Sequence, residues 1–151
     1  EASPAFHPRY NARSRRYRYT VYNAPVRDPL ARLYSLHVTV SLDVAAMARA
    51  AHLLVGERDF AAFGRSPKPS GPTVRRVLAA EWGGDAPQLH FDIEANAFLY
   101  RMVRSIVGTL LQVGRGKMGI EEFAAVLASC DRSQAGPTAP SHGLCLVEVK
   151  Y

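Results

Sequence analysis

The order of the predicted elements indicates an α+β domain, with helices packed on one face of a mostly antiparallel sheet. Segments of alternating apolar and polar residues are interleaved with segments whose apolar residues recur at helical spacing. The resulting order is strand, helix, two strands, long helix, short helix and strand. Because the 151 residues are 48% hydrophobic and show no repeat and no internal boundary, we expect a single domain over residues 1–151.

The first strand is predicted over residues 16–23, where side chains of two kinds alternate. Its apolar face holds Tyr17, Tyr19 and Val21, and its polar face holds Arg16, Arg18, Thr20 and Tyr22. Tyr17 has two interpretations that the pattern leaves open. An aromatic residue on a strand is either part of the core or a platform on which a base stacks.

The later elements are bounded by capping and turn residues. Asp43 is a helix cap, Gly114 ends the long helix, and the basic, proline-rich loop at 64–72 separates the first helix from the next strands. The predicted elements are an extended segment at 33–40, a helix from 44 to 54, strands at 74–82 and 88–94 joined by a turn at 83–87, a long helix from about 98 to 113, a short helix at 120–129 and a strand at 144–151.

The long helix carries an arginine at the border of its apolar face. On a wheel of about 100° per residue, Arg104 lies roughly 20° from Leu111. The apolar half holds Phe98, Leu99, Met102, Val103, Ile106, Val107, Leu110 and Leu111, and the other half holds Arg101, Ser105, Gly108 and Gln112. A guanidinium at this border is costly unless an acidic or phosphorylated group meets it. Glu94 or Asp92 would satisfy Arg104 within the chain, and a group from outside the chain is the alternative.

The net charge of +6 is concentrated near the N-terminus. Arginines and tyrosines alternate there: Arg9, Arg13, Arg15, Arg16 and Arg18 with Tyr10, Tyr17, Tyr19 and Tyr22. Guanidinium groups neutralise phosphates and tyrosine rings stack on bases. We therefore expect RNA as a partner, bound through Arg13, Arg15, Arg16 and Arg18.

The sequence predicts no metal site, no cofactor and no membrane span. The five histidines and the two cysteines, Cys130 and Cys145, match no metal-ligand spacing. Cys145 lies in an apolar segment and is expected in the core. No apolar run reaches the roughly 18 residues that a span requires. A reducing cytoplasm is the expected location.

Specific strings occur along the whole chain in a fixed order. They are Phe6-His7-Pro8-Arg9, Ser14-Arg15-Arg16-Tyr17-Arg18-Tyr19, Leu54-Val55-Gly56-Glu57-Arg58-Asp59-Phe60, the segment 92–108, Asp131-Arg132 and the segment 135–149. Together they closely resemble the C-terminal half of the TruA-type tRNA pseudouridine synthases. The string from Asn96-Ala97-Phe98 through Met102-Val103-Arg104 to Ile106-Val107-Gly108 is the most specific to that family.

The resemblance implies an RNA isomerase that converts uridines 38 to 40 of the tRNA anticodon stem-loop to pseudouridine, as a homodimer without cofactor or metal. That family uses a nucleophilic aspartate, a basic residue paired with it, and a tyrosine stacked on the target base. By motif position, Tyr17 resembles the tyrosine, Arg104 the basic residue, and Leu144 an apolar residue near the base. These roles are physically reasonable, since a fixed guanidinium keeps an aspartate ionised and a flipped base needs a flat partner.

The chain departs from the family at the nucleophile. The family places it in an Arg-Thr-Asp string followed by Gly-Val-His, and no such string occurs in these 151 residues. We therefore expect the C-terminal domain of a two-domain synthase, inactive without an N-terminal domain that carries the aspartate. The alternative hypotheses are a non-catalytic RNA-binding module and a dimerisation module.

Overall fold

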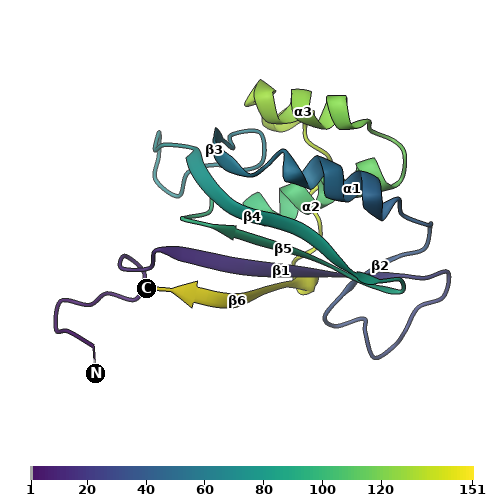
Figure 1. The fold of residues 1–151 in the computed structure, drawn as a ribbon, viewed down its shortest axis with the longest axis horizontal. Helices are drawn as coiled ribbons and strands as arrows, with labels where there is room; N and C mark the ends of the chain where they lie inside the picture. The colour runs from purple at the N-terminus through teal and green to yellow at the C-terminus, as the bar shows by residue number, and fades with distance from the viewer. Residues whose placement is uncertain (1) are drawn as a thin grey trace.

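The computed structural model describes residues 2–151 as a six-stranded sheet with three α-helices on one of its faces (Figure 1). The elements are β1 (Ser14–Asn23), β2 (Leu36–Val38), α1 (Val44–His52), β3 (Gly56–Asp59), β4 (Val74–Asp85), β5 (Gln88–Ala95), α2 (Met102–Gly114), α3 (Ile120–Ser129) and β6 (Leu144–Lys150), with 3-10 turns η1 (Arg132–Gln134) and η2 (Ser141–Gly143). The predicted α+β class is confirmed.

Strand β1 organises the sheet. The strand order is β2-β1-β5-β4-β3, and β6 also pairs with β1. Strands β5 and β6 run antiparallel to β1, whereas the short strand β2 runs parallel to it. Strand β6 pairs with the first part of β1, from Ser14 to Tyr19, and β2 pairs with the last part, from Val21 to Asn23. The two strands thus share one edge of β1. Because β6 runs antiparallel to β1, it ends beside the start of β1.

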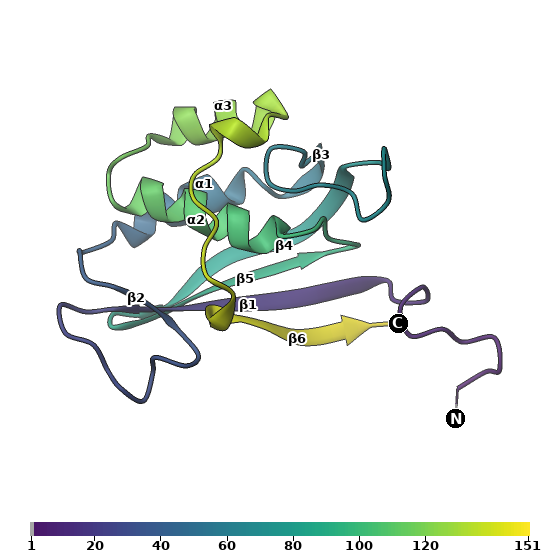
Figure 2. The same cartoon turned by 180° about the vertical axis from the view of Figure 1, so that it is seen from behind.

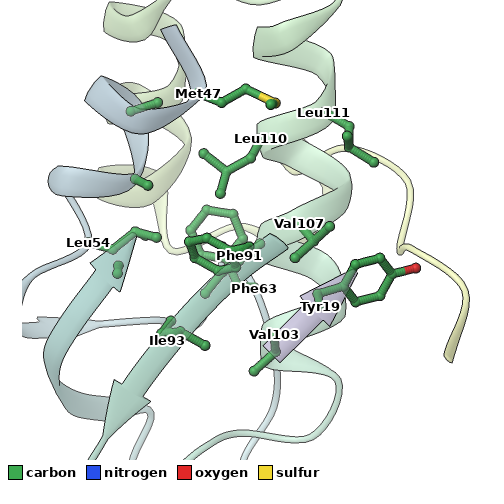
Figure 3. Close-up of a cluster of buried hydrophobic side chains, with 14 of the residues drawn as sticks. Tyr19, Met47, Leu54, Phe63, Phe91, Ile93, Val103, Val107, Leu110 and Leu111 are labelled. Atoms are coloured by element: carbon green, nitrogen blue, oxygen red, sulfur yellow. The ribbon is translucent and has the colours of Figure 1, made fainter. Parts of the chain in front are cut away.

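The core lies between the helices and the face of the sheet that carries the odd-numbered residues of β1. Tyr19 on β1 and Phe91 and Ile93 on β5 are fully buried there, against Ile106 and Leu110 of α2. Figure 3 shows this cluster between the sheet and the helices. Helix α3 packs on the outer side of α1 and α2 (Figures 1 and 2). Among residues 2–151, no helix has the length and apolarity needed to cross a membrane.

Helix α2 begins four residues later than the apolar spacing predicts. Phe98 and Leu99 lie before the helix, and Tyr100 forms an isolated antiparallel bridge with Arg65. Arg101 then adopts a left-handed conformation with φ 61°, so the chain turns sharply before Met102. The error has a physical cause, since Phe98 and Leu99 pack on the core from a segment that the bridge between Tyr100 and Arg65 keeps out of the helix.

The second difference concerns the polar half of the predicted wheel. Ser105 and Gly108, which the wheel places opposite the apolar face, are buried. They are covered by the loop from Ala135 to Pro140, which crosses α2 on its way from α3 to β6 (Figure 2). Helix α2 is therefore enclosed on more sides than its amphipathic pattern indicates.

Two strands differ from their sequence predictions because pairing, and not side-chain pattern, creates them. Strand β3 has the sequence Gly-Glu-Arg-Asp and shows no apolar alternation. It forms by antiparallel pairing with β4 at the edge of the sheet. The extended segment predicted at 33–40 is a strand only over Leu36–Val38, where it reaches β1.

The face of the sheet without helices carries a set of ion pairs. Arg18 donates two hydrogen bonds to Asp92, from Nε to Oδ1 at 2.7 Å and from Nη2 to Oδ2 at 2.8 Å. Glu94 accepts a hydrogen bond from Ser14 at 2.6 Å and pairs with Lys150 at 3.0 Å. The Arg18 guanidinium lowers the pKa of Asp92, and the Ser14 hydroxyl together with Lys150 lowers the pKa of Glu94.

We predict that Asp92→Asn lowers the free energy of unfolding by about 1 kcal/mol at pH 7, because a partly exposed bidentate pair is lost. A carboxylate with a lowered pKa stabilises the fold above its unfolded pKa of about 4 and loses that contribution as the pH falls through the folded value. The difference between wild type and variant should therefore shrink as the pH falls from about 5 to 2.

Urea denaturation at several pH values measures this difference. Glu148→Gln is the matched control, since its pair with Arg16 is longer, at 3.5 Å, and more exposed. A difference between wild type and Asp92→Asn that stays constant down to pH 2 would contradict the assigned pair.

Candidate functional site

Arg104 is held in place by two bonds to one residue of the crossing loop. Its Nε donates to the Ala139 carbonyl oxygen at 2.8 Å, and its own carbonyl oxygen accepts from the Ala139 amide at 3.0 Å. Ala139 is buried and Arg104 is half-buried. This reciprocal contact orients the guanidinium while using only one of its three nitrogens.

The internal ion pair offered as one explanation of Arg104 is absent from residues 2–151. Asp92 and Glu94 lie on the opposite face of the sheet, where they pair with Arg18 and Lys150. Within that part of the chain, no carboxylate lies within 4.0 Å of the Arg104 guanidinium, and its Nη atoms have no hydrogen-bond partner. These atoms are not sealed from solvent either. The geometry therefore leaves an oriented, accessible cation.

The loop that holds Arg104 approaches α2 closely because residue 108 is glycine. A Cβ at Gly108 would overlap the carbonyl oxygen of Pro137. At the next residue, the Thr109 hydroxyl donates to Ser105 O at 2.8 Å and accepts from the Gly136 amide at 3.0 Å. Sequence reasoning did not identify Gly108 as part of the site. Its small size, four residues after Arg104 on the polar half of the wheel, is the signal that could have done so.

Tyr19 ties the same loop to the sheet. Its ring is fully buried, and its hydroxyl donates to Pro140 O at 2.7 Å. In Figure 3 the hydroxyl points away from the apolar cluster toward this loop. Burial raises the pKa of Tyr19 to about 12, against an opposing effect of Arg104. The phenol therefore keeps its proton and remains a hydrogen-bond donor at physiological pH. It lies close enough to Arg104 for the positive charge to affect its pKa.

Tyr17 lies two residues before Tyr19 on the same face of β1. Its ring meets the ring of Phe98 edge-on, with centroids 5.0 Å apart and an interplanar angle of 86°. Tyr17 is half-buried, so it packs on the core while part of its surface remains accessible. Both interpretations of this residue, core aromatic and stacking platform, are compatible with that position.

Leu144 begins β6 directly after the crossing loop. It pairs with Tyr19 in the β1–β6 ladder, and Leu146 pairs with Tyr17. Leu144 is half-buried against the core. Gly143, immediately before it, is needed because a Cβ there would lie 2.8 Å from the Tyr19 ring. Tyr19, Arg104 and Leu144 thus belong to one connected region, joined through residues 139–144, and Tyr17 lies next to it on β1.

The four arginines predicted to bind RNA are not brought together on one face. Arg16 and Arg18 lie on the open face of the sheet, where they pair with Glu148 and Asp92. Arg15 lies on the side of Tyr17, and its Nη2 donates to Arg9 O. Arg13 precedes β1 and is exposed.

Both cysteines are exposed free thiols, so the expectation that Cys145 belongs to the core is wrong. Cys145 pairs with Arg18 in the ladder and therefore lies on the open face of the sheet. Within residues 2–151, no three potential ligands among His, Cys, Asp and Glu are placed to hold a metal ion.

Comparison with known families shows the family of this chain. The family profile described as tRNA pseudouridine synthase matches residues 50–151, a span that includes Arg104, the crossing loop and β6. The chain belongs to the tRNA pseudouridine synthase family. The proposed resemblance is confirmed, since residues 96–108 and 131–149 fall within the matched region.

Curated relatives extend the similarity over the whole chain. A protein named tRNA pseudouridine synthase A from Pelobacter propionicus is 47% identical over 151 residues, covering 100% of this chain and 62% of the relative. Proteins of the same name from Moorella thermoacetica and Syntrophotalea carbinolica are 46% and 48% identical, covering 100% and 97% of this chain and 61% and 58% of theirs. The chain thus spans about three fifths of the length of these relatives.

We predict that Gly108→Ala destabilises the fold by about 1–3 kcal/mol, because the added methyl group forces the loop away from α2. The Ala139 amide, which donates to Arg104 O, should then exchange its hydrogen faster. Denaturation and amide exchange measured by NMR test both effects.

Ser105→Ala is the control on the same helix. It removes a buried hydroxyl without a hydrogen-bond partner, so its stability should change little. Unchanged protection of Ala139 in Gly108→Ala would contradict this account.

Proposed function

We propose that this chain is the C-terminal part of a tRNA pseudouridine synthase and supplies the basic and aromatic side of its active site. The observation that carries the proposal is the state of Arg104, which is fixed by Ala139 yet has no carboxylate partner among residues 2–151. The aspartate that completes the site belongs to another part of the protein. The aspartates of this chain serve other contacts, as with Asp43 at the start of α1 and Asp131 at η1.

The proposed reaction is an isomerisation of uridine, so it needs no net oxidant. The bond between N1 and C1′ breaks, a bond between C5 and C1′ forms, the C5 proton leaves and N1 gains a proton. Arg104 acts on the nucleophile in this scheme. Its free Nη atoms donate to the incoming carboxylate, which lowers the carboxylate's pKa in a partly desolvated site and orients it. Because the guanidinium is already fixed through Nε, little conformational entropy is lost when the pair forms.

Tyr17 and Leu144 complete the wall on which the flipped base rests. The accessible surface of the Tyr17 ring stacks on the base and offsets part of the stacking lost on flipping. Its hydroxyl is the nearby group suited to accept the C5 proton. Leu144, at the end of the loop that anchors Arg104, supplies an apolar contact and excludes water from the reacting atoms.

The partners follow from the same proposal. The substrate is tRNA in the cytoplasm, at uridines of the anticodon stem-loop, and the protein works with its own N-terminal domain as a homodimer. Arg13 and Arg15 are the better placed of the four predicted arginines to meet RNA beside Tyr17. Arg16 and Arg18 would first have to leave the carboxylates that neutralise them.

We predict that Arg104→Ala in the intact protein lowers the rate of pseudouridine formation by roughly 10²–10³-fold at saturating tRNA, because the nucleophile loses its ionic partner. Arg104→Lys should recover part of the loss, since a point charge remains without the Nε contact to Ala139. Arg115→Ala, an exposed arginine just after the end of α2, is the control with the same change in charge. A wild-type rate in Arg104→Ala would remove the arginine from the mechanism.

Substitutions of Tyr17 separate stacking from proton removal. Tyr17→Phe keeps the ring and its contact with Phe98, so tRNA affinity should persist while the chemical step slows. Tyr17→Leu should also weaken binding of the flipped base. Single-turnover rates and dissociation constants measured together distinguish the two effects. Normal rates in both variants would mean that Tyr17 is only a core residue.

A further inference from the structure

A second basic site lies at the start of α2, the helix that carries Arg104. A cavity of about 590 Å³ opens between the segment after β3, the residues before α2, and η1. Its lining residues are Ala61, Gly64, Arg65, Tyr100, Arg101, Cys130, Asp131 and Arg132. Three of these side chains are arginines and one is a carboxylate, so the lining carries an excess of positive charge.

Tyr100 positions two of the three arginines. The Arg65 guanidinium lies over the Tyr100 ring at 4.9 Å from its centroid, and the Arg101 guanidinium lies 5.1 Å from the same centroid. The backbone fixes this arrangement, since the Tyr100 amide donates to Arg65 O at 3.0 Å. Tyr100 itself remains 49% exposed. Guanidinium groups held by stacking keep their N–H donors free for other partners.

None of the three arginines is neutralised within residues 2–151. Arg65, Arg101 and Arg132 form no ion pair there, whereas Arg16 and Arg18 on the open face of the sheet do. Asp131 is the carboxylate of the lining. Its Oδ1 accepts from the amide and the hydroxyl of Ser133, at 2.9 and 2.8 Å, so it serves to start η1.

The backbone at Arg101 is strained at this place. Its φ of 61° is uncommon for a residue with a Cβ and would suit glycine better. An arginine held in such a conformation is favoured where its side chain has a task that glycine could not perform.

The cavity and the Arg104 site share one loop. Arg132 donates from Nη2 to Thr138 Oγ1 at 2.6 Å, and the next residue, Ala139, holds Arg104. Arg101 itself directly precedes α2, three residues before Arg104 in the chain. The cavity and the residue that fixes Arg104 are therefore connected through residues 132–139 and through the start of α2.

We propose that this cavity binds a phosphodiester of the RNA strand next to the target nucleotide, with Arg65, Arg101 and Arg132 as the anion ligands. The proposal rests on the proposed function for the identity of the RNA. The site strengthens binding of the RNA backbone and fixes the register of the strand, so that the target base meets Tyr17 and Arg104. It contributes to binding and positioning and takes no part in bond breaking.

The test measures binding of a transcribed tRNA to the intact protein at several salt concentrations. Arg65→Gln and Arg101→Gln should each raise the dissociation constant by roughly 5- to 30-fold and reduce the salt slope by about 0.7–0.9, the value for one phosphate contact. Arg115→Gln, an exposed arginine at the far end of α2, is the matched control and should change neither quantity.

Arg101→Gly separates binding from folding. Glycine accepts the positive φ, so its melting temperature should equal or exceed that of wild type while its tRNA affinity falls as in Arg101→Gln. The proposal is overturned if Arg65→Gln, Arg101→Gln and Arg101→Gly bind with the affinity and salt slope of Arg115→Gln.

Pseudouridine formation by the wild type, measured with the same tRNA, keeps this outcome distinct from failure of the proposed function. If the wild-type protein forms pseudouridine and the variants bind tRNA normally, only the phosphate site is removed. If the variants bind tRNA more weakly but the wild-type protein forms no pseudouridine, only the assigned reaction is removed.

Discussion

The loop between α3 and β6 is held across α2 by the reciprocal bonds between Arg104 and Ala139, and most of the candidate site depends on this contact. It uses the backbone of both residues and the Nε of the arginine, so the loop and the guanidinium are positioned together. Such a contact lets a cation remain half-buried without a carboxylate, because a carbonyl oxygen satisfies one donor and solvent reaches the others. A salt bridge at this place would have occupied the Nη donors of Arg104, so they could not bind another group.

Several otherwise unrelated residues are explained by the need to bring this loop against the helix. Gly108 and Gly143 leave room for backbone and ring contacts that a Cβ would prevent. Tyr19 carries a polar group into the core because its hydroxyl reaches Pro140 O at the edge of the apolar cluster. The same loop enters β6, so the position of Leu144 beside Tyr19 is coupled to that of Arg104.

The distribution of charge separates the open face of the sheet from the candidate site. On the open face, Arg16, Arg18 and Lys150 are matched with carboxylates across neighbouring strands. Around the start of α2 and the crossing loop, Arg65, Arg101 and Arg104 lack acidic partners among the described residues. Total charge is therefore a weak guide to the site in this protein, since the neutralised arginines of the open face add to it as much as the free ones do.

Local pattern was enough to predict much of the fold and part of the site. Alternation along β1, β4 and β5 and the periodicity of α1 and α3 reflect contacts that each segment makes repeatedly along its length, so these elements were predicted near their observed positions. The family was also readable, because it rests on residues adjacent in the chain. Strand β3, the late start of α2 and the fixing of Arg104 by Ala139 were not. Each depends on contacts between distant segments, such as β3 with β4, Tyr100 with Arg65, and Ala139 with Arg104, whose geometry no local spacing specifies.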